Sequence, residues 1–363
     1  LFPYTTLFRS ATSSGLPLIE PARLSPYAGG MIARGLALSL LAAGLAAAQS
    51  SATVGTYTYD LNGRRVLASQ SGISATPGAS ANVRTTQSVN GRAVPAETVE
   101  EKVVSEGPDG KVVERIVKSY DESGRPVATE KQVITERKRD GGSEVSTAIY
   151  RSDLNGRLAL TERAQTVTSD SGAQSTAQTL VERVSLNGGL EPVERQQTVS
   201  RKDGQRVDTD TTVYRKDSNG GFSAAAREVV SVTQSGSTTT QNVTQYANAM
   251  TGQMELMGQR VVTTTVRPDG SQLQVVDVYG TTSAGRVSAD YSKGPKLQEQ
   301  QIIEKNVNPG GGFVETLSVR HANPENGALG SPRKISETVC SGNCIPPKPA
   351  DAKPAAEPKP NQP

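Results

Sequence analysis

Residues 155–188 read NGRLALTERAQTVTSDSGAQSTAQTLVERVSLNG and contain the pattern that decides the fold. Glycines recur at one constant interval from Gly156 to Gly252, at positions 156, 172, 188, 204, 220, 236 and 252, and each is preceded by Asn, Asp, Ser or Thr. Asn-Gly and Asp-Gly dipeptides are favoured in two-residue hairpin loops because both central positions need positive φ. The spacing therefore predicts a chain reversal at each of these glycines.

The segments between these turns have the composition of β-strands. About 12 residues separate successive turns, and runs such as Val229–Thr233 and Val261–Val266 are rich in β-branched side chains. At about 3.3 Å per residue, each strand would span roughly 40 Å. We therefore expect a long antiparallel meander built from 16-residue strand-and-turn repeats.

A second period, twice as long as the first, indicates that the repeating unit is a pair of hairpins. A tyrosine precedes every other turn, and Glu182 stands where one tyrosine is missing. Charged pairs recur with the same doubled period, at Glu130-Lys131, Glu162-Arg163, Glu194-Arg195 and Arg227-Glu228. The tyrosines of this series are Tyr120, Tyr150, Tyr214, Tyr246 and Tyr279.

Both faces of the predicted sheet are polar. Adjacent strand residues point to opposite faces, so each charged pair sends a carboxylate to one face and a cation to the other. A two-residue loop at Asp109-Gly110 would likewise place Glu101 opposite Lys118. We therefore expect an all-β fold, a coiled or spiral single-layer sheet stabilised by many cross-strand pairs rather than by one buried layer.

A closed outer-membrane β-barrel is the alternative fold. A sheet of about 16 strands must coil, split or close, and even spacing with antiparallel hairpins agrees with closure. A barrel's lipid-facing side should be apolar with aromatic girdles, however, and the strand around Thr161 carries Glu162 on one face and Arg163 on the other. The sequence therefore favours the open spiral.

Composition and charge exclude several classes of function. Hydrophobic residues make up 34% of the chain and aromatic residues 4%, which is too little for a thick core. The net charge of +3 lacks the concentrated basic face of a nucleic-acid-binding protein. We expect no nucleic-acid partner.

The ends of the chain differ in composition from the repeat. Residues 1–10, LFPYTTLFRS, resemble a translated sequencing adapter, and 1–30 are interpreted as an artefactual or untranslated, disordered leader. Residues 31–48 have the cationic start, short apolar run and small residues of a signal peptide, so the protein should be exported, to the periplasm or the exterior. No other apolar run is long enough for a transmembrane helix. The remaining divisions are 49–85, an early hairpin with a polar linker at 67–85; 86–339, the β-repeat domain; and 340–363, a Cys loop with a Pro/Lys/Ala-rich disordered tail.

Three segments resemble the tyrosine-aspartate repeat of the rearrangement-hotspot family: TYTYDLNGRRV at 56–66, SYDESGRPV at 119–127 and IYRSDLNGRLAL at 149–160. Those repeats build long β-spirals in secreted or surface proteins. The period of the turns in this chain departs from that of the family, and Asp follows Tyr only at Asp60 and Asp121. The resemblance implies an extended β-sheet and no catalytic residue.

The candidate site residues are few. The tyrosine series could be a stripe that stacks on sugars, although packing beside the turns is the simpler interpretation. Cys340 and Cys344, in CSGNC, are the only cysteines, and in an exported protein such a pair suggests a disulfide. Two cysteines without clustered histidines make a poor metal site, so no metal or other cofactor is expected.

No catalytic group stands out. His321 is the only histidine, and no nucleophile can be assigned to accompany it. We therefore expect a non-enzymatic structural or binding β-repeat protein of the bacterial cell envelope or exterior, with an unidentified protein or glycan as its partner. The alternatives are an outer-membrane β-barrel and a carbohydrate-binding or carbohydrate-active protein.

Overall fold

A computed structural model describes residues 50–60, 62–76, 79–153, 155–217, 219–249, 252–280, 295–323, 326–342 and 344. The predicted leader, signal peptide and Pro-rich tail lie outside the described residues. Within the described ranges, no helix is long and apolar enough to cross a membrane.

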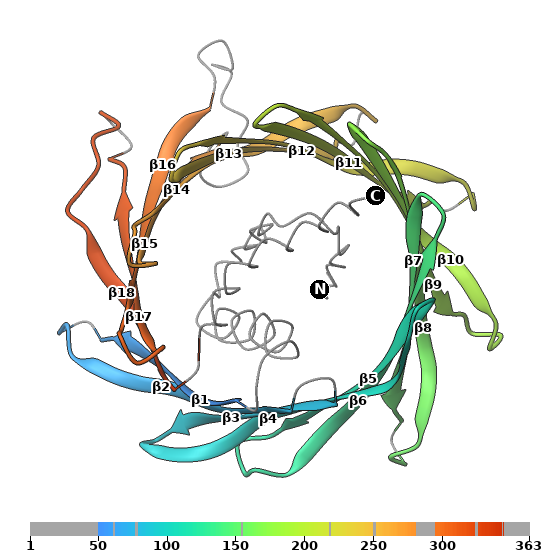
Figure 1. The fold of residues 1–363 in the computed structure, drawn as a ribbon, viewed down its shortest axis with the longest axis horizontal. Helices are drawn as coiled ribbons and strands as arrows, with labels where there is room; N and C mark the ends of the chain where they lie inside the picture. The colour runs from blue at the N-terminus through green and yellow to red at the C-terminus, as the bar shows by residue number, and fades with distance from the viewer. Residues whose placement is uncertain are drawn as a thin grey trace, which may run out of the picture.

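The described chain forms one antiparallel sheet of eighteen strands, as the β-branched segments predicted (Figure 1). Each strand pairs with its neighbours in sequence, so almost every contact joins the two arms of a hairpin. The strands are β1 (Ser50–Tyr59), β2 (Arg65–Thr76), β3 (Ser80–Val89), β4 (Arg92–Gly107), β5 (Gly110–Tyr120), β6 (Pro126–Arg139), β7 (Gly142–Ser152), β8 (Leu158–Ser171), β9 (Gln174–Val184), β10 (Leu190–Asp203), β11 (Arg206–Lys216), β12 (Phe222–Ser235), β13 (Thr238–Asn248), β14 (Met254–Val266), β15 (Gln272–Gly280), β16 (Lys296–Val307), β17 (Phe313–His321) and β18 (Arg333–Gly342).

The sheet closes into a barrel, so the predicted open spiral is wrong and the alternative is the fold. β1 pairs with β18 in an antiparallel register that runs from Ala52 opposite Gly342 to Thr58 opposite Ser336. Figure 1, which looks along the barrel axis, shows the strands forming a complete ring. Strand twist and tilt accumulate around such a ring, and closure removes the two unpaired edges that a spiral would leave.

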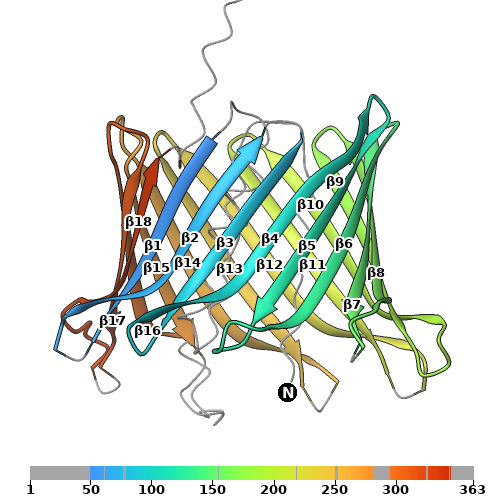
Figure 2. The same ribbon diagram turned by 90° about the horizontal axis from the view of Figure 1, so that it is seen from below.

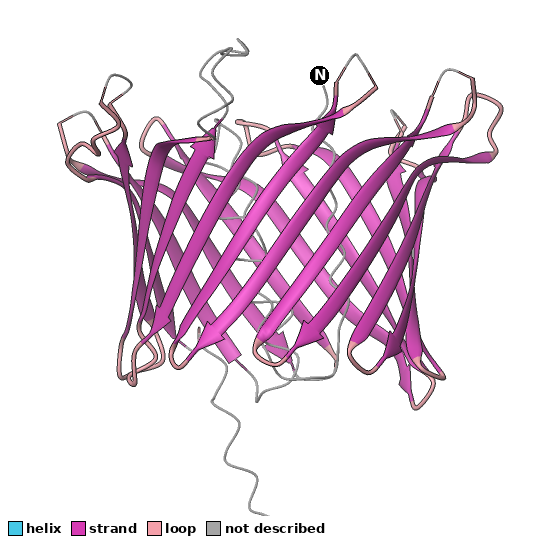
Figure 3. Cartoon of the chain, turned by 90° about the horizontal axis from the view of Figure 1, so that it is seen from above, coloured by secondary structure: helices cyan, strands magenta, loops and turns pink. Residues whose placement is uncertain are grey.

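The two rims of the barrel differ. β1 begins and β18 ends at the same rim, which also carries two-residue turns such as Asp140-Gly141 and Gly172-Ala173 (Figure 2). Longer loops connect most of the strands at the opposite rim (Figure 3). We call these the short-turn rim and the long-loop rim.

The glycine spacing predicted the reversals, but only half of the turn types. At the long-loop rim the glycine is the fourth residue of a five-residue loop, as in Asp153–Arg157, where Gly156 has φ +77° and donates its N–H to the carbonyl of Asp153. At the short-turn rim, the next glycine, Gly172, is the first of two turn residues. Glycines at one constant interval therefore occur alternately in five-residue loops and in two-residue turns.

Two further predictions are corrected. Residues 67–85 are not a linker: they lie largely in β2 and β3, and the barrel wall begins at Ser50 rather than at residue 86. The loop between β4 and β5 is Pro108-Asp109, and a register shift follows Val103, so Glu101 lies opposite Arg115 and not Lys118. A one-residue displacement of the turn, combined with a bulge, changed the partners.

Burial and chain hand identify the inner face of the wall. Val54 lies directly opposite Cys340 of β18 and Ser71 of β2. Following directly opposite residues from strand to strand in this way gives one set of alternating residues around the ring. Among the described strand residues, every buried side chain except that of Glu144 belongs to this set. Side chains converge on the concave side of a curved one-layer sheet, so this set faces the lumen.

The hand of the chain gives the same answer. Seen from outside, with the short-turn rim uppermost, successive strands run from left to right (Figure 2). For L-residues in strands ordered this way, a residue of β6 whose backbone groups hydrogen-bond toward β5 has its side chain on the inner face. Lys138 is such a residue, because its N–H donates to the carbonyl of Asp109. These two residues belong to the same alternating set.

Candidate functional site

The inner face carries a row of glutamate–arginine pairs near the long-loop rim. Each pair joins two directly opposite residues of adjacent strands, and from β6 to β11 the pairs recur with the doubled period of the sequence. Each arginine lies two residues before a five-residue loop, so the pairs share one level of the barrel. They are Arg151 Nε to Glu130 Oε2 at 2.8 Å, Arg183 Nε to Glu162 Oε2 at 2.9 Å and Arg215 Nε to Glu194 Oε2 at 3.1 Å. We call these six residues the inner charge arc.

Hydroxyl pairs lie closer to the short-turn rim on the same face. Thr166 Oγ1 and Thr179 Oγ1 are 2.9 Å apart, and Thr198 Oγ1 and Thr211 Oγ1 are 3.0 Å apart. Ser200 and Thr209 repeat the contact at 3.0 Å. Paired hydroxyls satisfy one another while keeping lone pairs that can accept from solute, so this sector of the wall is polar without being charged.

An apolar cluster interrupts the polar inner face where the barrel closes. Val54, Phe313, Cys340 and Cys344 are buried together, and Phe313 is only 1% exposed. A second cluster lies next to it, on β2, β3 and β4, with Ala75, Ala81, Val83 and Val99. The strands on either side of the β1–β18 pairing therefore carry buried apolar clusters on their inner face, next to buried polar residues such as Thr56 and Thr338.

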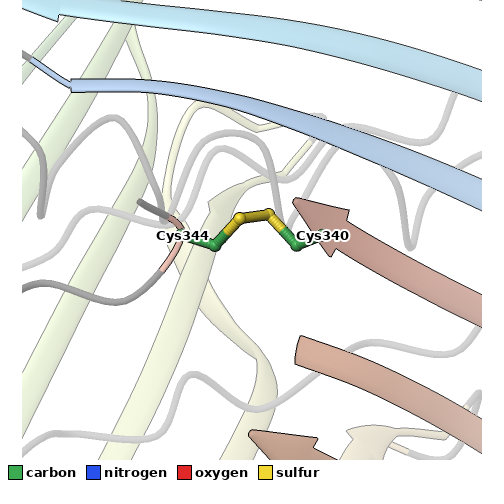
Figure 4. The surroundings of a disulfide bond; sticks show 2 residues. All are labelled: Cys340 and Cys344. Atoms are coloured by element: carbon green, nitrogen blue, oxygen red, sulfur yellow. A yellow bond between two sulfur atoms is a disulfide. The ribbon is translucent and has the colours of Figure 1, made fainter. Parts of the chain in front are cut away.

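The predicted cysteine pair lies in this apolar cluster. Cys340 is near the end of β18, directly opposite Val54 of β1, and it forms a disulfide with Cys344 (Figure 4). Both cysteine side chains are buried on the inner face. The disulfide therefore holds residue 344 against β1 and β17. This is beside the seam of the barrel, the line along which β1 pairs with β18.

The charged pairs split between the faces as the sequence predicted. Glu130, Glu162 and Glu194 point inward, and the residue after each points outward. Lys131 Nζ lies 2.8 Å from Glu114, and Arg163 Nη2 lies 2.6 Å from Glu182, both on neighbouring strands. Arg195 lies over the ring of Phe222, 4.2 Å from its centroid. In the fourth pair, the outward Arg227 Nη2 lies 2.6 Å from Asp210. The outer face thus carries ion pairs in the middle part of its strands.

The tyrosine series lies on the outer face, in one row beside the long-loop rim. Tyr150 is directly opposite Lys131, and Tyr246 opposite Arg227, which are outward residues. A register shift accompanies each of the five tyrosines, so a bulge marks every position. The row comprises Tyr120, Tyr150, Tyr214, Tyr246 and Tyr279, each half-buried.

The five-residue loops of the long-loop rim are organised by aspartates. The Oδ1 atom of Asp121 accepts the backbone N–H groups of Ser123 and Arg125, each at 2.9 Å. The Ser123 hydroxyl, followed by the Arg125 N–H, holds the pKa of Asp121 below its usual value. Asp60 repeats the arrangement, with its pKa lowered first by the N–H of Arg64. These carboxylates are structural and remain ionised at neutral pH.

Sequence reasoning missed the arginines of the inner charge arc. Arg151, Arg183 and Arg215 recur with the same doubled period as the charged pairs, and this repetition is the signal that could have found them. His321 ends β17, with 74% of its side chain exposed and Nδ1 3.4 Å from Glu299. No group of three or more possible metal ligands occurs in the described part of the chain.

Comparison with known proteins gave matches to solved structures only. No family model and no curated protein matches the chain. Salmonella typhi OmpF in complex with daunomycin is 10% identical, with a TM-score of 0.43 over 81% of this chain and 96% of its own. Pseudomonas aeruginosa OpdK with vanillate is 13% identical, with a TM-score of 0.46 over 81% and 97%. At these low values, activity must be argued from this chain's own residues.

The resemblance to the rearrangement-hotspot repeats is wrong. The three segments that carry it contain five-residue loops of the long-loop rim, at Asp60–Arg64, Asp121–Arg125 and Asp153–Arg157. The sheet around them closes on itself after eighteen strands instead of continuing as a spiral. In this chain, the letters that carry the resemblance belong to these loops.

Proposed function

We propose that this chain forms a channel for small hydrophilic solutes in the outer membrane of a bacterial cell. The observation that carries the proposal is the pairing of β1 with β18, which closes the wall around a polar inner face. Barrels of 16 to 18 strands leave an aqueous channel. With strands about 4.8 Å apart and tilted by about 40°, eighteen strands enclose roughly 35 Å between backbones, and roughly 25 Å after side chains are subtracted.

Two further features support a membrane position. Both ends of the wall and the short turns share one rim, while longer loops occupy the other, as in bacterial outer-membrane barrels. The outward tyrosine row would lie at the level of the lipid headgroups, where amphipathic rings are favourable. This replaces the expected periplasmic or extracellular location. Glycan binding by the same row remains a prediction, to be tested by tyrosine fluorescence during polysaccharide titration.

The outward ion pairs favour a second candidate, an exported barrel whose wall faces water or another protein. A cation at the bilayer midplane costs about 2–4 kcal/mol on a barrel surface. Pairing Lys131, Arg163 and Arg227 with carboxylates reduces this cost without removing it. This candidate keeps the barrel and loses the channel.

Membrane extraction and conductance separate the two candidates. The full chain, expressed with its own N-terminus, should require detergent for extraction, migrate faster on gels when unheated, and produce steps of conductance in planar bilayers. A barrel that stays in solution in plain buffer and produces no conductance would refute the channel and support the second candidate.

A further inference from the structure

We infer that the inner charge arc makes the channel almost indifferent to the sign of ionic charge, so that its preferred solutes are neutral or zwitterionic polar molecules. This inference rests on the proposed function and extends it to the class of solute. The arc covers six consecutive strands, β6 to β11, and alternates carboxylate and guanidinium from strand to strand.

In each pair of the arc, the guanidinium and the carboxylate are in direct contact. Each arginine Nε lies within 3.1 Å of its glutamate Oε2, so every positive charge of the arc has a negative charge beside it. The potential of such a pair falls off faster than that of a single charge. The screening length is about 8 Å at physiological ionic strength, shorter than the distance of roughly 12 Å from the wall to the axis.

The exposure of the side chains shows which partner a solute meets first. Glu162 is 8% exposed and its partner Arg183 is 43% exposed, and the other two arginines are also more exposed than their glutamates. The guanidinium groups therefore form the lumen surface, with the carboxylates beneath them. A solute that carries both donors and acceptors can bind such a surface, whereas a simple ion gains little from it.

The arc is also bounded in sequence and space. The doubled period would place the next pair at Ala226 and Ala247, which lie opposite each other on the inner face of β12 and β13. Beyond the arc toward the short-turn rim, the threonine pairs Thr166–Thr179 and Thr198–Thr211 continue the same sector as an uncharged, hydroxyl-bearing surface. This sector of the lumen wall therefore offers charged pairs and then hydroxyl pairs to a passing solute, which suits polyhydroxylated molecules.

The test is the reversal potential of single channels in a KCl gradient at low ionic strength, where screening is weakest. The wild-type channel should show a cation-to-anion permeability ratio close to unity. The triple variant Glu130→Gln, Glu162→Gln, Glu194→Gln removes three negative charges from the arc and should favour anions by at least about twofold. The triple variant Arg151→Gln, Arg183→Gln, Arg215→Gln should favour cations to a similar extent.

A matched control changes the same number of charges on the outer face. Glu114→Gln, Glu182→Gln and Asp210→Asn remove the carboxylate partners of the outward cations and should leave the permeability ratio unchanged. Gel mobility of unheated samples reports whether each variant still folds. Strong selectivity in the wild type, or equal shifts from inner and outer substitutions, would overturn the inference. A complete lack of conductance in folded wild type would instead refute the proposed channel.

Discussion

Reduction of the Cys340–Cys344 disulfide should loosen the barrel at its seam and nowhere else. The perturbation is mild, because dithiothreitol breaks the S–S bond, adds one hydrogen to each sulfur and changes no other atom. Both thiols can stay buried as small apolar groups. Removing one side chain would instead create a cavity or bury a hydroxyl. The reduced wild type is therefore the cleaner comparison.

The magnitude follows from the length of the closed loop. A cross-link between residues four apart in sequence constrains the unfolded chain by roughly 2 kcal/mol in the chain-entropy description. For a wall of this size, that difference corresponds to a shift of about 4 °C in the midpoint of thermal unfolding. The short-turn ends of β1 and β18 should respond most, because Cys340 lies directly opposite Val54.

Hydrogen exchange measured by mass spectrometry, together with the unfolding midpoint, provides the assay. Reduction should speed exchange in β1 and β18 and leave β9 and β10, on the far side of the ring, unchanged. The double variant Cys340→Ala, Cys344→Ala controls for side effects of the reductant, to which it should be insensitive. The reasoning fails if exchange rises equally around the ring, or if reduced and oxidised proteins unfold at the same midpoint.

Three further predictions concern the seam and the rims. Gly342→Ala should destabilise the barrel by about 1–3 kcal/mol, measured by urea unfolding, because Gly342 has φ +96° and a Cβ there would lie 2.6 Å from the Ser51 carbonyl oxygen; the same change at exposed Gly189 is the control, and equal effects would contradict the assignment. Phe313→Ala should cost about 3–5 kcal/mol, since the ring is 1% exposed in the seam cluster; a loss below about 1 kcal/mol would show that the ring is not packed there. The loop at Asp121 should lose amide protection as the pH falls below 3.8 through the lowered pKa, because the folded loop stabilises the ionised carboxylate at higher pH; Asp121→Asn should abolish that pH dependence, and an acid-induced loss of protection that is the same in wild type and variant would refute it.

The sequence predicted the strands and the division of charge between faces, because both depend on local spacing. The two-residue period alone sends Glu162 and Arg163 to opposite faces, and the structure confirms this. Turn type was harder to predict: Asn-Gly suits a two-residue hairpin, yet in Asp153–Arg157 the aspartate two residues earlier accepts the N–H groups of Asn155 and Arg157 and stabilises a longer loop. A short polar side chain thus overrode the dipeptide's preference.

The predicted linker at 67–85 failed for a different reason. Its small residues have weak intrinsic preference for strands, but their neighbours supply the packing. Ala75 lies opposite Ala81, and Val83 opposite Val99, within one buried cluster. Strand preference in a sheet reflects packing against cross-strand partners more than the backbone itself. Composition alone could not show those partners.

Closure could not be predicted from local spacing, and the composition of the seam explains how it is specified. Every other strand pair joins neighbours in sequence, whereas β1 and β18 meet across about 290 residues, for which loop closure costs on the order of 5 kcal/mol. The hydroxyl and ion pairs that suffice between sequential strands contribute only about 0.2–1 kcal/mol each. Where β1 and β18 meet, Phe313 and Val54 are buried in addition to a hydrogen bond from Tyr59 to Glu337, and full burial of such side chains contributes about 1.5–3 kcal/mol each.

Burial of these two side chains therefore matches the closure cost in order of magnitude, and the disulfide holds Cys344 in the same cluster. They also favour one register, since a slip of one residue would turn Val54 out of the cluster and onto the outer face. A polar wall that repeats almost identically every two strands could otherwise pair its ends at several positions, or continue by adding a strand from another chain. The change from charged pairs to buried apolar residues distinguishes the two closing strands from the rest of the wall.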